Sequence, residues 1–317
     1  MISVEMNSPF APWLDHSGAL LLDGGLGTEL ERRGHTQLGK LWSSALVRTN
    51  AMAIREVHRD YLEAGAGCIT SATFQAAMPT LQSAGLHVAE AEDLLRDAVA
   101  LAARERDRYH YRHPDRLRPI VAASIGPYGA SQCNGGEYTG DYQLSQRALH
   151  AFHAERWHVL CDSEADVIAL ETIPSWPEAR ALLALVAATP SRQAWISFTC
   201  RDTRHITDGT PLAEVIKAAN EVPNLCAIGV NCIAPRLALL LTKRITTMTA
   251  KPVIVYPNAS NAWDLTSRQP QDETLPDDFA FAAHQWRRAG ASILGGCCRT
   301  TPAHIAAMGE AVGSLRV

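Results

Sequence analysis

The sequence predicts an α/β protein with the fold of a (β/α)8 barrel, also called a TIM barrel. Short apolar runs alternate with amphipathic stretches along the whole chain, eight such runs are present, and no Pro-, Gly- or Ser-rich linker interrupts them. Strands that are apolar on both faces and separated by helices pair in parallel with right-handed crossovers, and eight such units close as a barrel. We therefore expect one domain over residues 1–317. A doubly wound open sheet in two domains is the alternative architecture.

The strands are recognised as short runs of apolar and β-branched residues bounded by turn residues. In chain order, the predicted strands span residues 19–22, 67–70, 120–123, 167–170, 195–198, 227–230, 253–256 and 292–294. The sequence Glu-Ala-Gly-Ala leads into the second strand, and Arg-Ala-Gly-Ala leads into the eighth. Gly65 and Gly290 in these repeats are expected to end helices, because glycine readily adopts the left-handed conformation found there.

The helices are recognised by apolar positions that recur with a period near 3.6 residues. They are predicted at residues 52–63, 88–109, 143–161, 177–188, 212–219, 234–247, 279–288 and 303–313. Two stretches, 126–140 and 256–278, are predicted to be long loops over the top of the barrel. His150, His153 and His158 have no metal-binding spacing, so we expect them on the solvated face of their helix.

Composition narrows the classes of function. The chain has 47% hydrophobic and 20% charged residues, and its formal net charge is -4. This balance predicts no general attraction to nucleic acid or to anionic membranes, and a small neutral or zwitterionic substrate fits it better. The N-terminus lacks the pattern of a secretory signal, and no run reaches the roughly 18 apolar residues of a membrane span. We expect a cytoplasmic protein whose eight cysteines are reduced.

Three cysteines occupy the C-terminal ends of predicted strands. Cys297 and Cys298 follow the eighth strand and precede a helix with Pro302 in its first turn, and Cys232 ends the sixth strand. Adjacent cysteines rarely close a disulfide on each other because the ring is strained, but both can point at one metal ion. Three thiolates without a fourth protein ligand would leave Zn²⁺ one open position, as in catalytic sites. Buried structural cysteine is the alternative, and it is the interpretation for Cys68, Cys133, Cys161, Cys200 and Cys226.

Polar residues follow the other predicted strands. In a barrel these ends converge on one mouth, where the active sites of this fold lie. The residues are Asp23, Ser71, Thr73, Ser124, Glu171, Thr172, Thr199, Asn231, Tyr256 and Asn258. The glycine-rich turn after the first strand imitates a dinucleotide-binding fingerprint, but Leu30 stands where the third glycine belongs. Nucleotide binding is therefore not expected.

Several motifs together resemble the zinc-dependent homocysteine S-methyltransferase family nearly from end to end. They are Asp23-Gly24-Gly25-Leu26-Gly27-Thr28-Glu29-Leu30, Glu171-Thr172, Asp208-Gly209-Thr210-Pro211, Gly229-Val230-Asn231-Cys232, Tyr256-Pro257-Asn258 and Gly295-Gly296-Cys297-Cys298-Arg299-Thr300. Residues 126–130 and 137–142 are most similar to the short bacterial and plant branch, which uses S-methylmethionine. The resemblance implies a (β/α)8 barrel, Zn²⁺ on Cys232, Cys297 and Cys298, and methyl transfer to homocysteine that yields methionine.

The three sulfur ligands suit this chemistry. A free thiol near neutral pH is only a few per cent thiolate, which is the nucleophile, and zinc deprotonates a thiol that it binds. Three thiolates also make zinc a poor Lewis acid for water, which favours alkyl transfer over hydrolysis. The zinc-bound homocysteine thiolate is then expected to attack the methyl group of S-methylmethionine, or of S-adenosylmethionine as a slower donor.

Substrate contacts are predicted from the polar strand ends. Asp23 and Glu171 are placed to bind the ammonium group of homocysteine, and the backbone of Gly24 and Gly25 its carboxylate. Thr73, Thr172 and Asn231 are further expected contacts, although Asn231 is also placed to orient the Cys232 loop. Aromatic faces hold a sulfonium methyl group well, and the candidates are Trp42 foremost, with Phe74, Tyr128, Tyr138 and Tyr256. Phe74 stands where the resemblance leads us to expect tyrosine.

Two other functions stay open from the sequence. Betaine is an alternative methyl donor, but fewer than about twenty residues follow Cys298, so the chain lacks the C-terminal extension with which longer relatives oligomerise. We therefore expect a monomer. A non-catalytic zinc store or thiol redox sensor is the alternative from another class, with the adjacent cysteines oxidising when the metal is lost. A related thiol or selenol is an alternative methyl acceptor.

Overall fold

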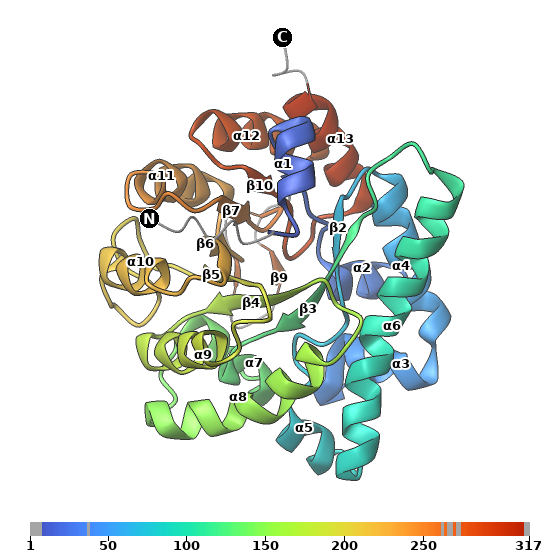
Figure 1. Ribbon diagram of the computed structural model, residues 1–317, viewed down its shortest axis with the longest axis vertical. Helices are drawn as coiled ribbons and strands as arrows, with labels where there is room; N and C mark the ends of the chain where they lie inside the picture. Colours follow the sequence, from blue (N-terminus) through green and yellow to red (C-terminus); the bar gives the residue numbers. More distant parts are fainter. Residues whose placement is uncertain (1–7, 37–38, 261–262, 265–268, 271–273, 314–317) are drawn as a thin grey trace.

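Eight parallel strands form the centre of the molecule, and helices surround them (Figure 1). The computed structural model describes residues 8–36, 39–260, 263–264, 269–270 and 274–313. The strands of the central sheet are β1 (Leu20–Leu21), β2 (Cys68–Thr70), β3 (Ile120–Ile125), β4 (Val167–Ile173), β5 (Ala194–Phe198), β6 (Leu225–Asn231), β7 (Val253–Tyr256) and β10 (Ile293–Leu294). They lie side by side in chain order, with β10 pairing both β7 and β1.

The sheet closes between β1 and β2. Leu22 forms a parallel bridge with Cys68, and the Asp23 N–H donates to the Cys68 carbonyl at 2.9 Å. Between the same two strands, the Gly67 N–H donates to the Leu21 carbonyl at 2.8 Å. Closure excludes the open doubly wound sheet, and the predicted (β/α)8 barrel is confirmed.

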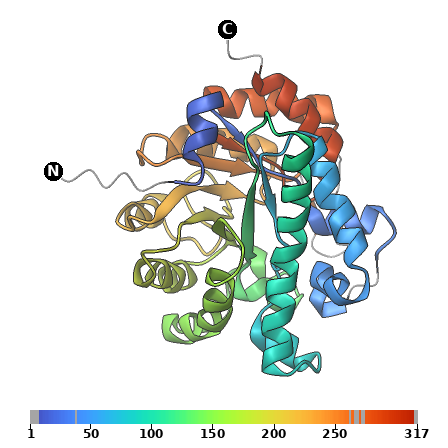
Figure 2. The ribbon, with the colours of Figure 1, turned by 45° about the vertical axis from the view of Figure 1, so that its right-hand side comes forward.

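The barrel helices lie outside the strands. They are α4 (Ala51–Glu63), α6 (Val88–Arg112), α8 (Gln146–Cys161), α9 (Trp176–Ala188), α10 (Leu212–Asn220), α11 (Pro235–Ile245), α12 (Pro276–Arg288) and α13 (Pro302–Gly313). Figure 2 shows the longest of them, α6, running along the outside of the barrel. Gly65 and Gly290 follow α4 and α12 with φ of 100° and 105°, as the repeated sequence predicts.

The inside of the barrel is packed with apolar side chains and is plugged at its N-terminal end. Leu20, Trp195 and Ile254 are fully buried there, together with Phe10. The Phe10 ring lies 5.9 Å from the Trp195 ring between centroids, and Phe10 immediately precedes α1 (Ala11–Ser17). A Cβ on Gly67, just before β2, would meet the Trp13 ring of α1 at 2.7 Å. Helix α1 therefore covers the end of the barrel opposite to the C-terminal mouth, where the active sites of this fold lie.

Short elements around the mouth are not predicted from the sequence. They are η1 (Gly39–Ser44), α3 (Ala45–Thr49), α5 (Met78–Ser83), α7 (Tyr128–Gln132) and η2 (Gly136–Tyr138), while α2 (Leu26–Arg32) follows the glycine-rich turn. One or two helical turns contain too few apolar repeats to be recognised. In the second predicted loop, β8 (Trp263–Asp264) pairs antiparallel with β9 (Gln269–Pro270). Residues 261–262, 265–268 and 271–273 of that loop lie outside the described residues.

The prediction that His153 lies on a solvated face is wrong. Its side chain on α8 is fully buried, and Nε2 lies 2.8 Å from Oε1 of Glu178 on α9. Burial, reinforced by the charge of Arg156, lowers the pKa of His153 to about 4, so this ring is neutral at physiological pH. The helical period places His153 correctly on α8, but it does not show that α9 covers this side of the helix.

Candidate metal and substrate site

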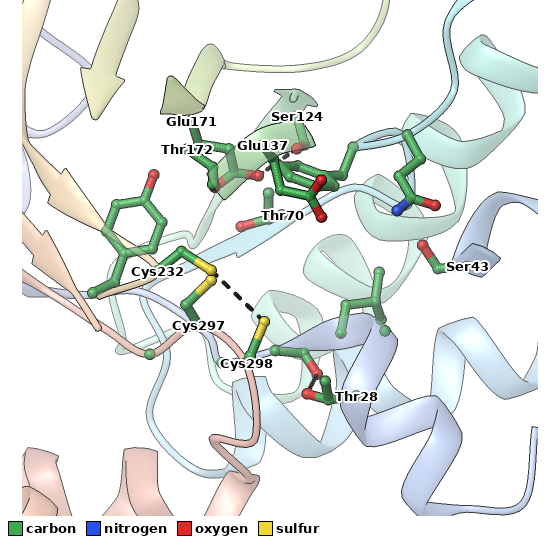
Figure 3. Close-up of a pocket in the computed structure, with 18 of the residues that line it drawn as sticks. Thr28, Ser43, Thr70, Ser124, Glu137, Glu171, Thr172, Cys232, Cys297 and Cys298 are labelled. Atoms are coloured by element: carbon green, nitrogen blue, oxygen red, sulfur yellow. Dashed lines mark hydrogen bonds between the residues drawn. The ribbon is translucent and has the colours of Figure 1, made fainter. Parts of the chain in front are cut away.

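The three candidate metal ligands meet at the C-terminal mouth of the barrel. Cys232 follows β6, and Cys297 and Cys298 follow β10 after Gly295 and Gly296. Their Sγ atoms all lie within 4.8 Å of one another, and those of Cys232 and Cys298 are 3.8 Å apart. Figure 3 shows the three sulfurs pointing toward one another at the edge of a pocket.

This donor set fits a tetrahedral metal ion with one remaining position. Zinc–sulfur bonds are about 2.3 Å long, so two sulfurs on a tetrahedral zinc ion lie about 3.8 Å apart. The Cys232–Cys298 separation equals this value, and the other separations need only a small adjustment. Three soft thiol donors favour Zn²⁺ over the oxygen-preferring cations Mg²⁺ and Ca²⁺.

The loops that carry the cysteines are held in uncommon backbone conformations. Cys232 has φ of 53° and Arg299 has φ of 66°, both in the left-handed region that non-glycine residues rarely adopt. Thr172, at the neighbouring end of β4, has φ of 64°. Such conformations persist only where surrounding contacts enforce them, and they cluster at functional sites.

Hydrogen bonds fix the cysteine loops. The Cys297 N–H donates to the Pro257 carbonyl at 2.8 Å, and the Cys298 N–H donates to Asn258 Oδ1 at 3.1 Å. Thr300 Oγ1 donates to the Cys297 carbonyl at 2.6 Å and accepts from the Gly25 N–H at 3.0 Å. The end of β7 and the turn after β1 therefore hold both adjacent cysteines in place.

Asn231 stabilises the strand ends beneath the pocket through hydrogen bonds. Its Oδ1 accepts from the Thr172 N–H at 2.8 Å and from Ser197 Oγ at 2.9 Å, and its Nδ2 donates to Thr172 Oγ1 at 2.7 Å. It is fully buried and does not line the pocket. Its hydrogen bonds lock the ends of β4, β5 and β6 together, which agrees with the orienting role considered from the sequence.

Asp23 follows β1, and its carboxyl group accepts hydrogen bonds from β2. Oδ2 accepts from the Thr70 N–H at 2.7 Å, and Oδ1 accepts from Thr70 Oγ1 at 2.9 Å. Burial raises the pKa of Asp23 to about 8, although the Thr70 hydrogen bonds oppose this effect. The charge of Glu171 raises the pKa further. A cation beside this buried carboxyl group would favour its charged form and lower its pKa.

Glu171 reaches the same space from β4. Its Oε1 accepts a hydrogen bond from Ser124 Oγ, which lies on β3. Burial raises the pKa of Glu171 to about 7, partly offset by hydrogen bonds from Ser124 and Tyr256. Figure 3 shows Glu171 and Ser124 across the pocket from the cysteines. Two carboxyl groups with raised pKa values in one cleft are a recognised signature of functional sites.

The remaining predicted contacts divide into two groups. Gly24, Gly25, Thr172 and Tyr256 line the pocket together with Asp23, Glu171 and the three cysteines. Thr73 does not line it: the side chain is fully buried, and its hydroxyl donates to the Ser124 carbonyl at 2.7 Å. Thr73 thus stabilises the end of β3 instead of facing a ligand.

The aromatic candidates also divide. Phe74, Tyr138 and Tyr256 line the pocket. Tyr128 lies on α7, where its ring contacts those of Tyr142 and Phe152, and it is not a lining residue. The side chain of Trp42 lies outside the described residues.

Several lining residues have no signal in the sequence. Glu31 and Ser43 come from the short helices α2 and η1, Gln75 comes from the turn after β2, and Glu137 comes from the loop after β3. Cys133, interpreted from the sequence as a packing residue, lines the pocket from the same loop. Polar residues in irregular segments have no periodicity that would show their direction, so the folded loop alone reveals them.

The pocket has the size of a small-molecule site. Its volume is about 400 Å³, and its walls come from strand ends around the mouth and from the loop after β3. This volume lies at the lower end of the usual range for ligand sites. Among the described lining residues, Asp23, Glu31, Glu137 and Glu171 are acidic and Arg299 alone is basic.

The fold and the site together define a class: a (β/α)8 barrel with three thiols that could hold a metal ion beside a small acidic cleft at its C-terminal mouth. The model of the homocysteine S-methyltransferase family matches residues 20–312, and this chain belongs to that family. Homocysteine S-methyltransferase from Escherichia coli K12 is 41% identical over 307 residues, covering 96% of this chain and 99% of the relative. Selenocysteine Se-methyltransferase from Brassica oleracea is 39% identical, covering 94% and 90%.

Solved structures agree with the family assignment. The homocysteine methyltransferase MmuM from Escherichia coli superimposes in its metallated form with a TM-score of 0.86 at 40% identity, over 95% of this chain and 98% of that one. Its oxidized form gives a TM-score of 0.88 over 95% and 99%. In the part of this chain that the structure describes, no helix is long and apolar enough to cross a membrane.

Proposed function

We propose that this protein is a homocysteine S-methyltransferase that takes the methyl group from a sulfonium donor, S-methylmethionine first, and forms methionine. The observation that carries the proposal is the gathering of Cys232, Cys297 and Cys298 beside Asp23 and Glu171 in one pocket. The family assignment and the metallated form of MmuM support it.

The proposed cofactor is Zn²⁺ held by the three cysteines. When bound, the metal supplies positive charge that keeps the sulfur of the substrate deprotonated at neutral pH. The chain itself supplies a water-poor wall around that sulfur, because Cys232 and Tyr256 are nearly completely buried. Gly25 brings the turn after β1 against the cysteine loop, since a Cβ there would lie 2.5 Å from the Cys297 carbonyl oxygen.

Asp23 and Glu171 are the proposed partners of the homocysteine ammonium group. Each is buried and has a hydroxyl group as a fixed hydrogen-bond donor, from Thr70 and Ser124 respectively. An ammonium group that enters this space lowers the pKa of both carboxyl groups, because it favours their charged form. Binding at one end of the amino acid then places its sulfur at the cysteine cluster.

The acidic walls of the pocket support a cationic donor. A sulfonium donor carries a positive charge on the sulfur that loses its methyl group. In the transfer, the homocysteine sulfur forms a bond to the methyl carbon while the donor carbon–sulfur bond breaks. The donor sulfur keeps the electron pair and becomes a neutral thioether, and the thiol proton of homocysteine goes to solvent. Alignment of the two sulfurs on either side of the methyl group is the contribution of the pocket.

The free cysteines support a reducing compartment. The eight cysteines, all within the described residues, form no disulfide, and the three at the mouth bind metal only as thiolates. We therefore propose that the protein acts in the cytoplasm.

The decisive experiment compares zinc content and methionine formation in the wild-type protein and in Cys297→Ser. Cys161→Ala at the end of α8 is the control, because that buried cysteine belongs to no metal cluster in the described chain. We expect about one zinc ion per chain and activity with S-methylmethionine, both lost in Cys297→Ser and kept in the control. Selenocysteine as acceptor and betaine or S-adenosylmethionine as donor are assayed in parallel. Bound zinc without transfer from any donor would refute the methyltransferase and leave the redox or storage role.

A further inference from the structure

A tyrosine from the loop after β3 contacts one of the three sulfurs. Tyr138 is the last residue of η2, and its hydroxyl oxygen lies 3.2 Å from Cys232 Sγ. This separation is within hydrogen-bonding distance for sulfur. A second polar side chain, that of Asn231, is more distant, with Nδ2 4.0 Å from Cys297 Sγ. The Tyr138 hydroxyl also interacts with the Cys298 sulfur, and its 3.2 Å contact is with Cys232.

The loop holds Tyr138 in this position by close backbone packing. A Cβ on Gly129 of α7 would lie 2.3 Å from the Gly136 carbonyl carbon, so these two short elements touch directly. Gly135 and Cys133 make the intervening turn with φ of 82° and 54°. The Tyr138 N–H donates to the Gly135 carbonyl at 3.0 Å. Tyr138 is thus presented by a compact turn, not by an extended loop tip.

A buried cluster on two outer helices fixes the start of the same loop. Glu178 of α9 accepts from the Tyr128 N–H at 2.6 Å and from His153 of α8 at 2.8 Å. His153 Nδ1 in turn accepts from Arg156 at 2.8 Å, and Arg156 also donates to the Gly126 carbonyl. All three side chains are fully buried. We name Glu178, His153 and Arg156 the loop clamp.

The chemistry of the contact sets its direction. A cysteine that binds a metal ion is a thiolate, which has no proton to donate. The Tyr138 hydroxyl is therefore the donor, and the Cys232 sulfur is the acceptor. Hydrogen bonds from outer residues orient metal ligands and tune their electron density, and their loss commonly reduces metal affinity 10- to 100-fold.

We propose that Tyr138 is a positioning residue of the metal site: it donates a hydrogen bond to the Cys232 thiolate and thereby couples the packed loop after β3 to metal binding. This inference rests on the proposed metal site. It concerns a residue that contacts one of the metal-binding cysteines and does not itself bind the metal. It predicts that the loop changes metal affinity without contributing a metal ligand.

The test compares Tyr138→Phe with Tyr128→Phe in the full-length protein. Each variant loses one hydroxyl from the same loop and keeps its ring, but the Tyr128 hydroxyl has no contact with a sulfur in the described structure. Zinc affinity is measured by competition with a chromophoric chelator. We expect about a tenfold weaker affinity in Tyr138→Phe and an unchanged affinity in Tyr128→Phe.

A spectroscopic readout separates hydrogen bonding from a general loss of structure. With Co²⁺ in place of zinc, the sulfur-to-metal charge-transfer band should move to lower energy in Tyr138→Phe, because the thiolate loses a hydrogen bond that stabilises its electrons. Tyr128→Phe should keep the wild-type band. If Tyr138→Phe matches the wild type in both affinity and band position, the inference is wrong. A wild-type protein that binds neither metal instead overturns the proposed metal site.

Discussion

Burial changes the charge state of Asp23 and Glu171, the proposed partners of the homocysteine ammonium group. Burial raises the pKa of Asp23 to about 8 and that of Glu171 to about 7, so a large fraction of both is neutral in the free protein near neutral pH. Only the ionised forms pair strongly with an ammonium group. We therefore expect the KM for homocysteine to fall as the pH rises through about 7 to 8. Steady-state kinetics over this range, at saturating donor, checks the prediction.

The variant Asp23→Asn isolates one of these groups. Asparagine can still bond to Thr70, but it has no charge for the substrate ammonium. We expect kcat/KM to fall about 10- to 100-fold, because a hydrogen bond to a charged group contributes about 1.5–3 kcal/mol, and the pH dependence of KM to weaken. Asp115→Asn, at an exposed position between α6 and β3, is the control. An unchanged pH profile in Asp23→Asn would contradict the assignment.

The same pKa shifts predict how stability responds to pH. The folded-state pKa of Asp23 is above the value of about 4 for an unfolded aspartate. The folded state therefore holds this proton more tightly, and the corresponding stability is present at low pH and is lost as pH rises from about 4 through 8. We expect the ligand-free protein to melt at a lower temperature at pH 8 than at pH 6, with a smaller difference in Asp23→Asn. Differential scanning calorimetry of both proteins measures this.

At the scale of elements, β6 depends on a glycine that brings it close to β7. A Cβ on Gly229 would lie 1.7 Å from the Ile254 carbonyl oxygen, and that backbone atom belongs to the next strand of a closed barrel. We expect Gly229→Ala to lower the free energy of unfolding by about 3 kcal/mol or more and to weaken metal binding at Cys232, which follows the same strand. Gly313→Ala at the end of α13, where a Cβ meets nothing within 4 Å, is the matched control for urea denaturation.

The loop clamp predicts a link between the outer helices and the mouth. In Glu178→Gln the buried Arg156 guanidinium loses the nearby negative charge, and removal of one member of a buried charge pair costs about 3–5 kcal/mol. We expect lower stability together with weaker zinc binding, because the loop that carries Tyr138 loses its support. Glu155→Gln, exposed on α8, should change neither. Wild-type zinc affinity in a destabilised Glu178→Gln protein would show that the clamp supports only the fold.

At the scale of the whole molecule, the proposed metal site joins strands that are not neighbours. Cys232 follows β6, and Cys297 and Cys298 follow β10, with β7 between them in the sheet. A ligand that binds only the folded state stabilises it by about 2.7 kcal/mol at a concentration 100 times its Kd. We expect zinc to raise the melting temperature of the wild-type protein, and removal by a chelator to reverse the effect. The melting temperature of Cys297→Ser should not respond to zinc.

The closed sheet also supports the proposal of a single domain. The central sheet takes strands from both ends of the chain, since β1 pairs with β10. Neither half can therefore complete the barrel alone. We expect one cooperative unfolding transition whose midpoint does not depend on protein concentration, and sedimentation equilibrium near the mass of one chain. Two transitions would argue for separable units.

Much of the fold follows from local patterns. All eight strands and eight barrel helices are recognised from the sequence. Their apolar residues recur regularly enough to distinguish a strand from a helix and to show which side is buried. The short elements α5, α7 and η2 are not recognised, because one turn of helix shows no period. Of these, η2 lines the pocket through Glu137 and Tyr138, so a poorly predictable element lies at the proposed substrate site.

The sequence by itself determined the barrel, the gathering of three strand-end cysteines, and the family. Each depends on regular strands and on the residues that directly follow them, and the position of such residues in a barrel follows from their position in the sequence. Only the tertiary structure decided which polar residues face the pocket: Asp23 and Glu171 do, whereas Thr73 and Asn231 are buried supports. It also decided the place of Tyr138 at Cys232 and of His153 between Glu178 and Arg156. These contacts join segments far apart in the chain through irregular loops or neighbouring helices, and no periodic pattern records which side chains such packing brings together.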